Sequence, residues 1–165
     1  MVIDNSISCY NTLSAEHSIQ TIRILLSSLS SSDLPFFDLI ITTERDPIVL
    51  CLEKNINNAL NDNSEFWGTF YSLLISKNIK TDLASAIRVA YEINNFRKTD
   101  CTNYIFVITD GLFSKLNQSN IKQKVMMCEN KGISIFGIGI GISPGLKIYL
   151  IKLYILKILI IYYQD

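Results

Sequence analysis

The chain has 165 residues, of which 48% are hydrophobic and 18% are charged, and its formal net charge is zero. One domain of this length buries a substantial core, so the composition argues against a disordered chain and against a basic nucleic-acid-binding surface. A single histidine and four widely spaced cysteines, with no Cys-x-x-Cys pair, argue against a zinc site. We expect reduced thiols and an intracellular, cytoplasmic protein.

The first half of the chain alternates between strand and helix patterns. Residues 1–3 are apolar and predict the end of a buried strand whose beginning is missing or very short. Residues 14–29 place isoleucines and leucines at helical spacing and predict an amphipathic helix. Strands are expected at 37–43 and, after a proline and therefore at a sheet edge, at 48–52. Aromatic residues within 56–77 predict a short helix that packs an aromatic face into the core.

The second half continues this alternation. A helix is predicted over 81–94, capped by its first or second residue, and a strand buried on both faces over 104–109. A further helix and strand are expected at 119–130 and 133–138. Such alternation predicts an α/β fold, with a Rossmann-like, doubly wound, mostly parallel sheet flanked by helices on both faces.

The C-terminal segment has a different character. Residues 146–165 are mostly isoleucine, leucine and tyrosine, interrupted by Lys147, Lys152 and Lys157. Neither helical nor strand periodicity places these lysines on one face. Three interpretations stay open, namely an irregular or non-native end, a packed final helix, and a membrane anchor. We therefore divide the chain into a domain at 1–145 and an atypical tail at 146–165. The short first strand and the tail together indicate a fragment of a larger protein or a faulty gene model.

Five oxygen-bearing residues lie where ligands bind in such folds, namely Asp4, Ser6, Ser8, Thr81 and Asp110. The first three follow the first strand, and the last follows the strand at 104–109. If those two strands flank the reversal of strand order, their carboxyl ends meet in one crevice. Hydroxyl and carboxylate oxygens are the ligands that magnesium prefers. Each residue alone is also typical of a helix cap or a turn, so the prediction depends on the combination.

The pattern Asp-x-Ser-x-Ser, followed by a distant Thr and a distant Asp, resembles the metal-ion-dependent adhesion site of the von Willebrand factor A domain, also called the integrin I-like domain. The resemblance covers about residues 1–142. It implies that Ser6 and Ser8 bind Mg²⁺ (or Mn²⁺ as a substitute) directly, and that Thr81 binds directly or through water. It further implies that Asp4 and Asp110 act largely through water, and that the open position accepts a Glu or Asp side chain of another protein.

Two features depart from this family. The first strand is central in the family and very short here, and the tail shows neither the last strand nor the final helix. An affinity switch based on that helix is therefore not implied. The reduced cysteines fit the intracellular branch of the family, which includes the domain in the ribosome-assembly ATPase midasin.

Two alternatives compete with a metal-dependent, non-enzymatic protein-binding module. One is a scaffold that keeps the fold without binding metal. The other is a metal-dependent phosphatase-like hydrolase, in which a second aspartate would serve as general acid two residues after the first. Ser6 occupies that position and cannot transfer a proton at neutral pH. A serine-nucleophile elbow and a P-loop are also absent from the sequence.

Overall fold

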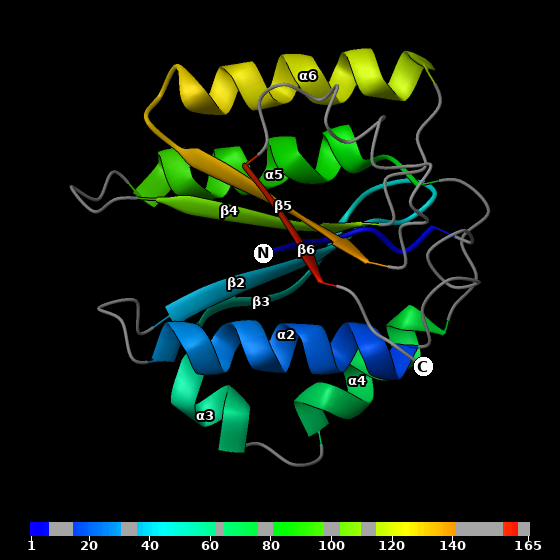
Figure 1. Cartoon of the computed structure of the whole chain (residues 1–165), viewed down its shortest axis with the longest axis vertical. Helices are drawn as coiled ribbons and strands as arrows, with labels where there is room; N and C mark the ends of the chain where they lie inside the picture. The colour runs from blue at the N-terminus through cyan, green and yellow to red at the C-terminus, as the bar shows by residue number, and fades with distance from the viewer. Residues whose placement is uncertain are drawn as a thin grey trace.

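The structure is a computed structural model, and it describes residues 1–6, 15–30, 36–61, 65–75, 81–97, 103–109, 115–140 and 157–161. These residues form strands and helices in alternation (Figure 1). In chain order, the elements are β1 (Val2–Ile3), α2 (Ala15–Ser30), β2 (Phe36–Ile41), β3 (Ile48–Asn55), α3 (Ile56–Asn61), α4 (Glu65–Leu74), α5 (Leu83–Arg97), β4 (Tyr104–Thr109), α6 (Lys115–Glu129), β5 (Ser134–Ile140) and β6 (Lys157–Ile161).

The strands form one sheet in the order β3-β2-β1-β4-β5-β6. All neighbouring strands run parallel except β2 and β3, which form an antiparallel pair at one edge. From the central β1, the chain adds β2 and β3 on one side and then β4, β5 and β6 on the other. This arrangement confirms the predicted α/β, doubly wound fold and the edge position of the strand after Pro47.

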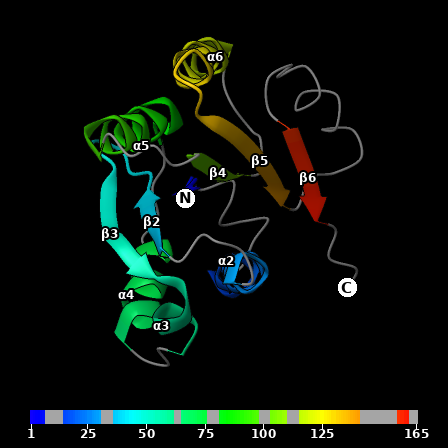
Figure 2. The ribbon, with the colours of Figure 1, turned by 90° about the vertical axis from the view of Figure 1, so that its left-hand side faces the viewer.

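The helices cover both faces of the sheet (Figures 1 and 2). Helices α2, α3 and α4 pack on one face and contribute Ile22, Ile56 and Phe70 to the first core cluster. Helices α5 and α6 pack on the other face, where Ile87 and Ile121 belong to the second cluster. The sheet is therefore buried on both sides, which explains why its parallel strands are nearly continuous apolar runs.

Strand β1 is as short as the sequence predicted and nevertheless lies at the centre of the sheet. Val2 lies opposite Ile40 of β2 and Val107 of β4. The side chain of Val2 belongs to the core under α5 and α6, and that of Ile3 belongs to the core under α2, α3 and α4. Burial on both faces and pairing on both edges hold this two-residue strand in place.

The aromatic segment forms two helices, α3 and α4, where we expected one. Its rings pack as core, as predicted: the Phe66 ring contacts the rings of Phe37 and Trp67 edge to face. The Trp67 indole N–H donates to the Ala59 carbonyl, with an N–O distance of 2.9 Å. Phe70 is fully buried. Residues 62–64, which connect the two helices in sequence, lie outside the described residues.

The other helices differ from the prediction mainly at their ends. Helix α5 continues to Arg97, and α6 begins at Lys115, four residues before the predicted start at Ser119. Gly137 and Gly139 lie within β5 and not in a turn before a helix, so this glycine run does not form a phosphate-binding loop.

Part of the tail forms a strand that none of the three interpretations anticipated. Strand β6 pairs parallel with β5, and the register places Lys157 opposite Phe136 and Ile161 opposite Ile140. The rest of the tail, 141–156 and 162–165, lies outside the described residues. Among the helices that the structure describes, none is long and apolar enough to cross a membrane.

Candidate functional site

The candidate site lies at the carboxyl ends of the central strands. Strand order reverses around β1, whose neighbours are β2 on one side and β4 on the other. A polar residue stands at the end of each of these strands: Asp4 after β1, Thr42 after β2 and Thr109 at the end of β4. All three are almost completely buried. This is the position at which open α/β sheets bind their ligands.

The carboxylate of Asp4 is the centre of the site. Its Oδ2 accepts a hydrogen bond from the Thr109 hydroxyl at 2.7 Å. Its Oδ1 accepts hydrogen bonds from the Thr81 hydroxyl and from the Ser6 backbone N–H, both at 3.1 Å. Asp4 is only 5% exposed, and burial of a charged group is costly unless it is compensated by such bonds. The carboxylate therefore joins three segments that are distant in the sequence.

Thr81 reaches Asp4 because its neighbour caps the helix. The Oδ1 of Asp82 accepts a hydrogen bond from the Ser85 backbone N–H at 3.1 Å, and its Oδ2 accepts one from the Ser85 hydroxyl at 2.6 Å. Of the two predicted caps, Asp82 therefore occupies the N-cap position of α5. This leaves Thr81 just before the helix, with its hydroxyl directed at the carboxylate.

A second set of hydrogen bonds fixes the backbone after Asp4. The Asn5 backbone N–H donates to the Thr42 hydroxyl oxygen at 2.8 Å, and the Asn5 side-chain amide donates to the Leu73 carbonyl at 3.0 Å. The loop after β1 is thus tied to the end of β2 and to the last turn of α4. Since the Ser6 N–H binds Asp4, these bonds also restrict where Ser6 lies.

The structure brings together three of the five predicted site residues. Asp4, Ser6 and Thr81 converge, whereas Ser8 and Asp110 lie outside the described residues. Asp110 directly follows Thr109, whose hydroxyl contacts Asp4. The full set of five stays a prediction, and the contacts of Asp4 with the Ser6 backbone and the Thr81 hydroxyl are observed.

Sequence reasoning assigned no role to Thr109, Thr42 or Asn5. A signal for the two threonines was nevertheless present. Each follows an aliphatic run in a strand, so each falls at the carboxyl edge of the sheet, where polar side chains face the ligand crevice. Asn5 carried no comparable signal, because its partner Leu73 is 68 residues away in the sequence.

The described part of the site fits a hard divalent cation. The Thr81 hydroxyl donates its proton to Asp4, so the lone pairs of its oxygen face away from the carboxylate. The side chains that we assign to the site offer oxygen alone, which suits Mg²⁺ or Mn²⁺ better than softer metals. Among the described residues no three His, Cys, Asp or Glu side chains form a cluster, so such a site would depend on hydroxyl ligands.

The comparisons with known proteins are informative at the level of structure. The sequence matches no family model and no curated protein. Its structure is similar to the von Willebrand factor type A protein of Catenulispora acidiphila, with a TM-score of 0.63 and 16% identity over 98% of this chain and 38% of the other. It is also similar to the manganese-loaded TRAP protein of Plasmodium vivax, with a TM-score of 0.65 and 14% identity over 91% and 59%.

A third similar structure is an aerotolerance-related membrane protein from Bacteroides fragilis, with a TM-score of 0.60 and 17% identity over 84% of this chain and 65% of the other. This chain thus spans less than two thirds of each of these three proteins. The order of the strands, the helices on both faces and these similarities agree. The fold of the chain is like that of von Willebrand factor A domains.

Proposed function

We propose that the chain is a metal-dependent protein-binding module. Mg²⁺ would be held by Asp4, Ser6, Ser8, Thr81 and Asp110, and a Glu or Asp side chain of a partner protein would complete its coordination. One observation carries the proposal: the buried Asp4 carboxylate gathers the Thr81 hydroxyl and the Ser6 N–H at the reversal of strand order.

Each residue has a definable task in this proposal. The hydroxyl oxygens of Ser6, Ser8 and Thr81 would contact the cation. Asp4 would orient the Thr81 hydroxyl, as its 3.1 Å hydrogen bond supports, and together with Asp110 would neutralise a double positive charge. A cation held mainly by neutral oxygens attracts a further carboxylate, and this attraction is what the metal would supply.

The fold supports a role in recognition, and it also supplies a probe. One structure of similar fold is a manganese-loaded protein from Plasmodium vivax. Mn²⁺ accepts the same oxygen ligands as Mg²⁺ and is paramagnetic, so its binding can be measured directly.

A metal-free scaffold is the second candidate, and one observation favours it. The Asp4 carboxylate already accepts hydrogen bonds from Thr109, Thr81 and Ser6, so its burial is compensated without a cation. In that case the network would serve only to join β1, β4 and the start of α5. The two candidates differ in whether a divalent cation stabilises the fold.

The test is a titration of the full chain with Mn²⁺, followed by electron paramagnetic resonance, with Mg²⁺ as competitor. Thermal unfolding is measured in parallel. At ten times its dissociation constant, a ligand adds about 1.4 kcal/mol to the free energy of unfolding. For a chain of this size, that raises the unfolding midpoint by roughly 3–6 °C. Ser6→Ala and Asp110→Asn should remove both signals.

Ser28→Ala is the matched control for the serine variant, because Ser28 is exposed on α2 and its hydroxyl donates to the Ile24 carbonyl one turn earlier in the same helix. It should bind Mn²⁺ like the parent chain. If the parent chain binds no Mn²⁺ and unfolds cooperatively, the metal proposal fails and the scaffold stands. If Mn²⁺ binds, peptides selected in Mg²⁺ and eluted by chelation should contain Glu or Asp, and amide replacement of that residue should abolish binding.

A further inference from the structure

A cavity of about 410 Å³ lies between the end of β2, the start of β3 and the last turn of α4. Ile41, Ile48 and Leu73 supply its aliphatic wall, and Asn5 lines it from the loop after β1. The Asn5 side-chain amide donates to the Leu73 carbonyl at 3.0 Å, so the loop and the helix form one continuous wall. We call this space the side pocket.

The side pocket adjoins the candidate metal site through Asn5. This residue stands between Asp4 and Ser6, and the Ser6 backbone N–H donates to the Asp4 carboxylate at 3.1 Å. Neighbouring Cα atoms of a peptide are about 3.8 Å apart, so a bound segment can reach from the metal to the side pocket within about three residues. A partner segment that offers a carboxylate to the metal would therefore place a nearby side chain here.

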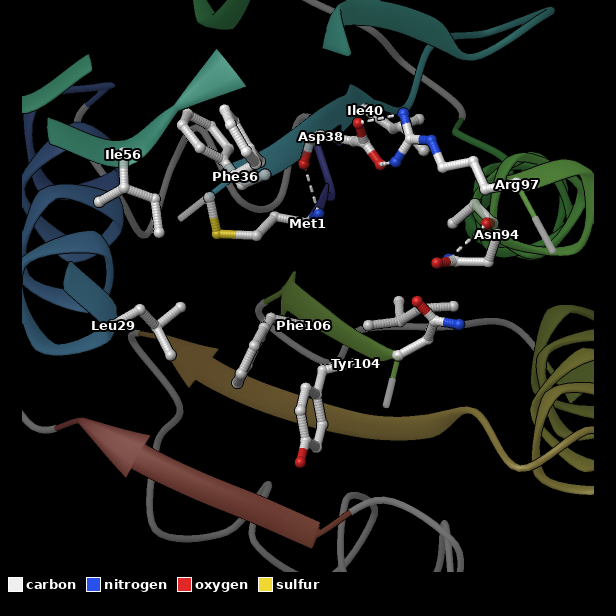
Figure 3. A pocket seen from close by; sticks show the side chains of 14 residues that line it. Met1, Leu29, Phe36, Asp38, Ile40, Ile56, Asn94, Arg97, Tyr104 and Phe106 are labelled. Carbon is white, nitrogen blue, oxygen red and sulfur yellow. Dashed lines mark hydrogen bonds and ion pairs between the residues drawn. The ribbon is translucent and has the colours of Figure 1, made fainter. Parts of the chain in front are cut away.

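Figure 3 shows a smaller cavity, of about 140 Å³, at the opposite end of the sheet. Strand β2 runs from Phe36, which lines that cavity, to Ile41, which lines the side pocket. In the smaller cavity, Arg97 already donates to both carboxylate oxygens of Asp38, at 2.6 and 2.9 Å. Of the two spaces, the side pocket is the one at the carboxyl ends of the strands, where open α/β sheets bind their ligands.

The turn between β2 and β3 forms the polar wall of the side pocket. The Thr43 hydroxyl donates to the Asp46 carbonyl at 2.8 Å and accepts a hydrogen bond from the Arg45 backbone N–H at 3.2 Å. These bonds fix the backbone of the turn before any ligand binds, which lowers the cost of ordering it. The guanidinium of Arg45 makes no hydrogen bond or ion pair to the described part of the chain, so it is available to a ligand.

The walls of the side pocket favour an uncharged aromatic side chain. Ile48 is 39% exposed, and a large exposed aliphatic side chain beside a cavity is typical of a binding surface. A cavity of about 150 Å³ can accept a benzene ring, so the side pocket has room for an aromatic residue. The turn carries Glu44 and Asp46 beside Arg45, and therefore has no positive net charge to attract a second carboxylate. The Arg45 guanidinium can instead pack on the face of a ring.

We propose that the side pocket binds an aromatic side chain of the same partner segment that supplies the Glu or Asp ligand. The aromatic residue would lie within about three residues of the acidic one. The metal would attract any suitable carboxylate, and the side pocket would discriminate between partners that carry one. This inference rests on the proposed function, because the metal places the partner segment beside the pocket.

The test is a selection of random dodecapeptides displayed on phage, on the full chain in Mg²⁺, with elution by chelation. Eluted peptides should carry Phe, Tyr or Trp at one fixed spacing from Glu or Asp. The same selection on Ile48→Asp should keep the acidic residue and lose the aromatic one. Val49→Asp is the matched control, because Val49 is also 39% exposed on β3 and stands outside the lining of the side pocket. It should select the same sequences as the parent chain.

Affinities of a selected peptide measure the effect. Replacing its aromatic residue by alanine should weaken binding to the parent chain about tenfold, and binding to Ile48→Asp less than about twofold. Arg45→Met lies in an exposed turn and tests the pocket even if Ile48→Asp does not fold. It should weaken binding of the aromatic peptide about threefold and leave that of the alanine peptide unchanged.

The outcomes separate the two proposals. If acidic residues are not enriched, or if chelation elutes nothing, the metal proposal fails and this inference fails with it. If acidic residues are enriched without an aromatic residue at a fixed spacing, or with a basic one in its place, this inference alone fails. It also fails if Ile48→Asp and Val49→Asp select the same sequences, or if Arg45→Met weakens both peptides equally.

Discussion

Thr109→Val offers the sharpest test of the hydrogen-bond network around Asp4. The substitution keeps the shape of the side chain and removes the hydroxyl that donates to Asp4 Oδ2 at 2.7 Å. Thr109 is 3% exposed, so water cannot readily replace this donor. The experiment is performed with a chelator present, so that metal binding does not contribute.

The expected cost follows from the geometry. A hydrogen bond to a charged group contributes about 1.5–3 kcal/mol to the free energy of unfolding. The substitution removes the Thr109 donor from Oδ2 of the buried Asp4. Oδ1 keeps its bonds from Thr81 and Ser6, so we expect a loss of about 2 kcal/mol. For a chain of 165 residues, this lowers the unfolding midpoint by roughly 4–8 °C.

Thermal and urea unfolding, followed by circular dichroism, measure this loss. Thr69→Val is the control. Thr69 is exposed on α4, and threonine and valine have similar helix propensities. A double-mutant cycle with Asp4→Ala isolates the pair: without the carboxylate, Thr109→Val should cost little. The reasoning is refuted if Thr109→Val is no more destabilising than Thr69→Val, or if its cost is unchanged in the Asp4→Ala background.

Two further predictions concern charge and pKa. Arg97→Met removes a guanidinium that donates to both carboxylate oxygens of Asp38 in a mostly buried pair, and should lower the free energy of unfolding by about 1–3 kcal/mol. Arg88→Met breaks the exposed ion pair with Glu92 on α5 and should cost at most about 0.5 kcal/mol. Urea unfolding measures both variants, and equal losses for Arg97→Met and Arg88→Met would contradict this reasoning. Burial raises the pKa of the Cys51 thiol to about 11. Because the thiolate reacts, the rate of Cys51 alkylation by iodoacetamide, with the other cysteines replaced by serine, should rise about tenfold per pH unit from pH 8 to 10. A plateau near pH 9 would show an ordinary thiol.

Much of the fold followed from patterns that are local in the sequence. The apolar run at 104–109 predicted the exact bounds of β4, because a strand buried on both faces tolerates few polar residues. Helix ends were less well predicted: α6 begins four residues early, because Lys115, Asn117 and Gln118 are polar and Leu116 alone gives no periodic signal. Strand β6 was missed because its pairing partner β5, and not its own periodicity, determines its conformation.

The sequence by itself determined the alternation of elements, the presence of one mostly parallel sheet and the types of residue at the carboxyl ends of its strands. Periodicity and composition suffice for these, since each depends on neighbours within a few residues. Only the tertiary structure decided which side chains meet. Asp4 contacts Thr81 and Thr109 across 77 and 105 residues of sequence. Strand order brings Thr109 beside Asp4, and the packing of α5 against the sheet brings Thr81 there.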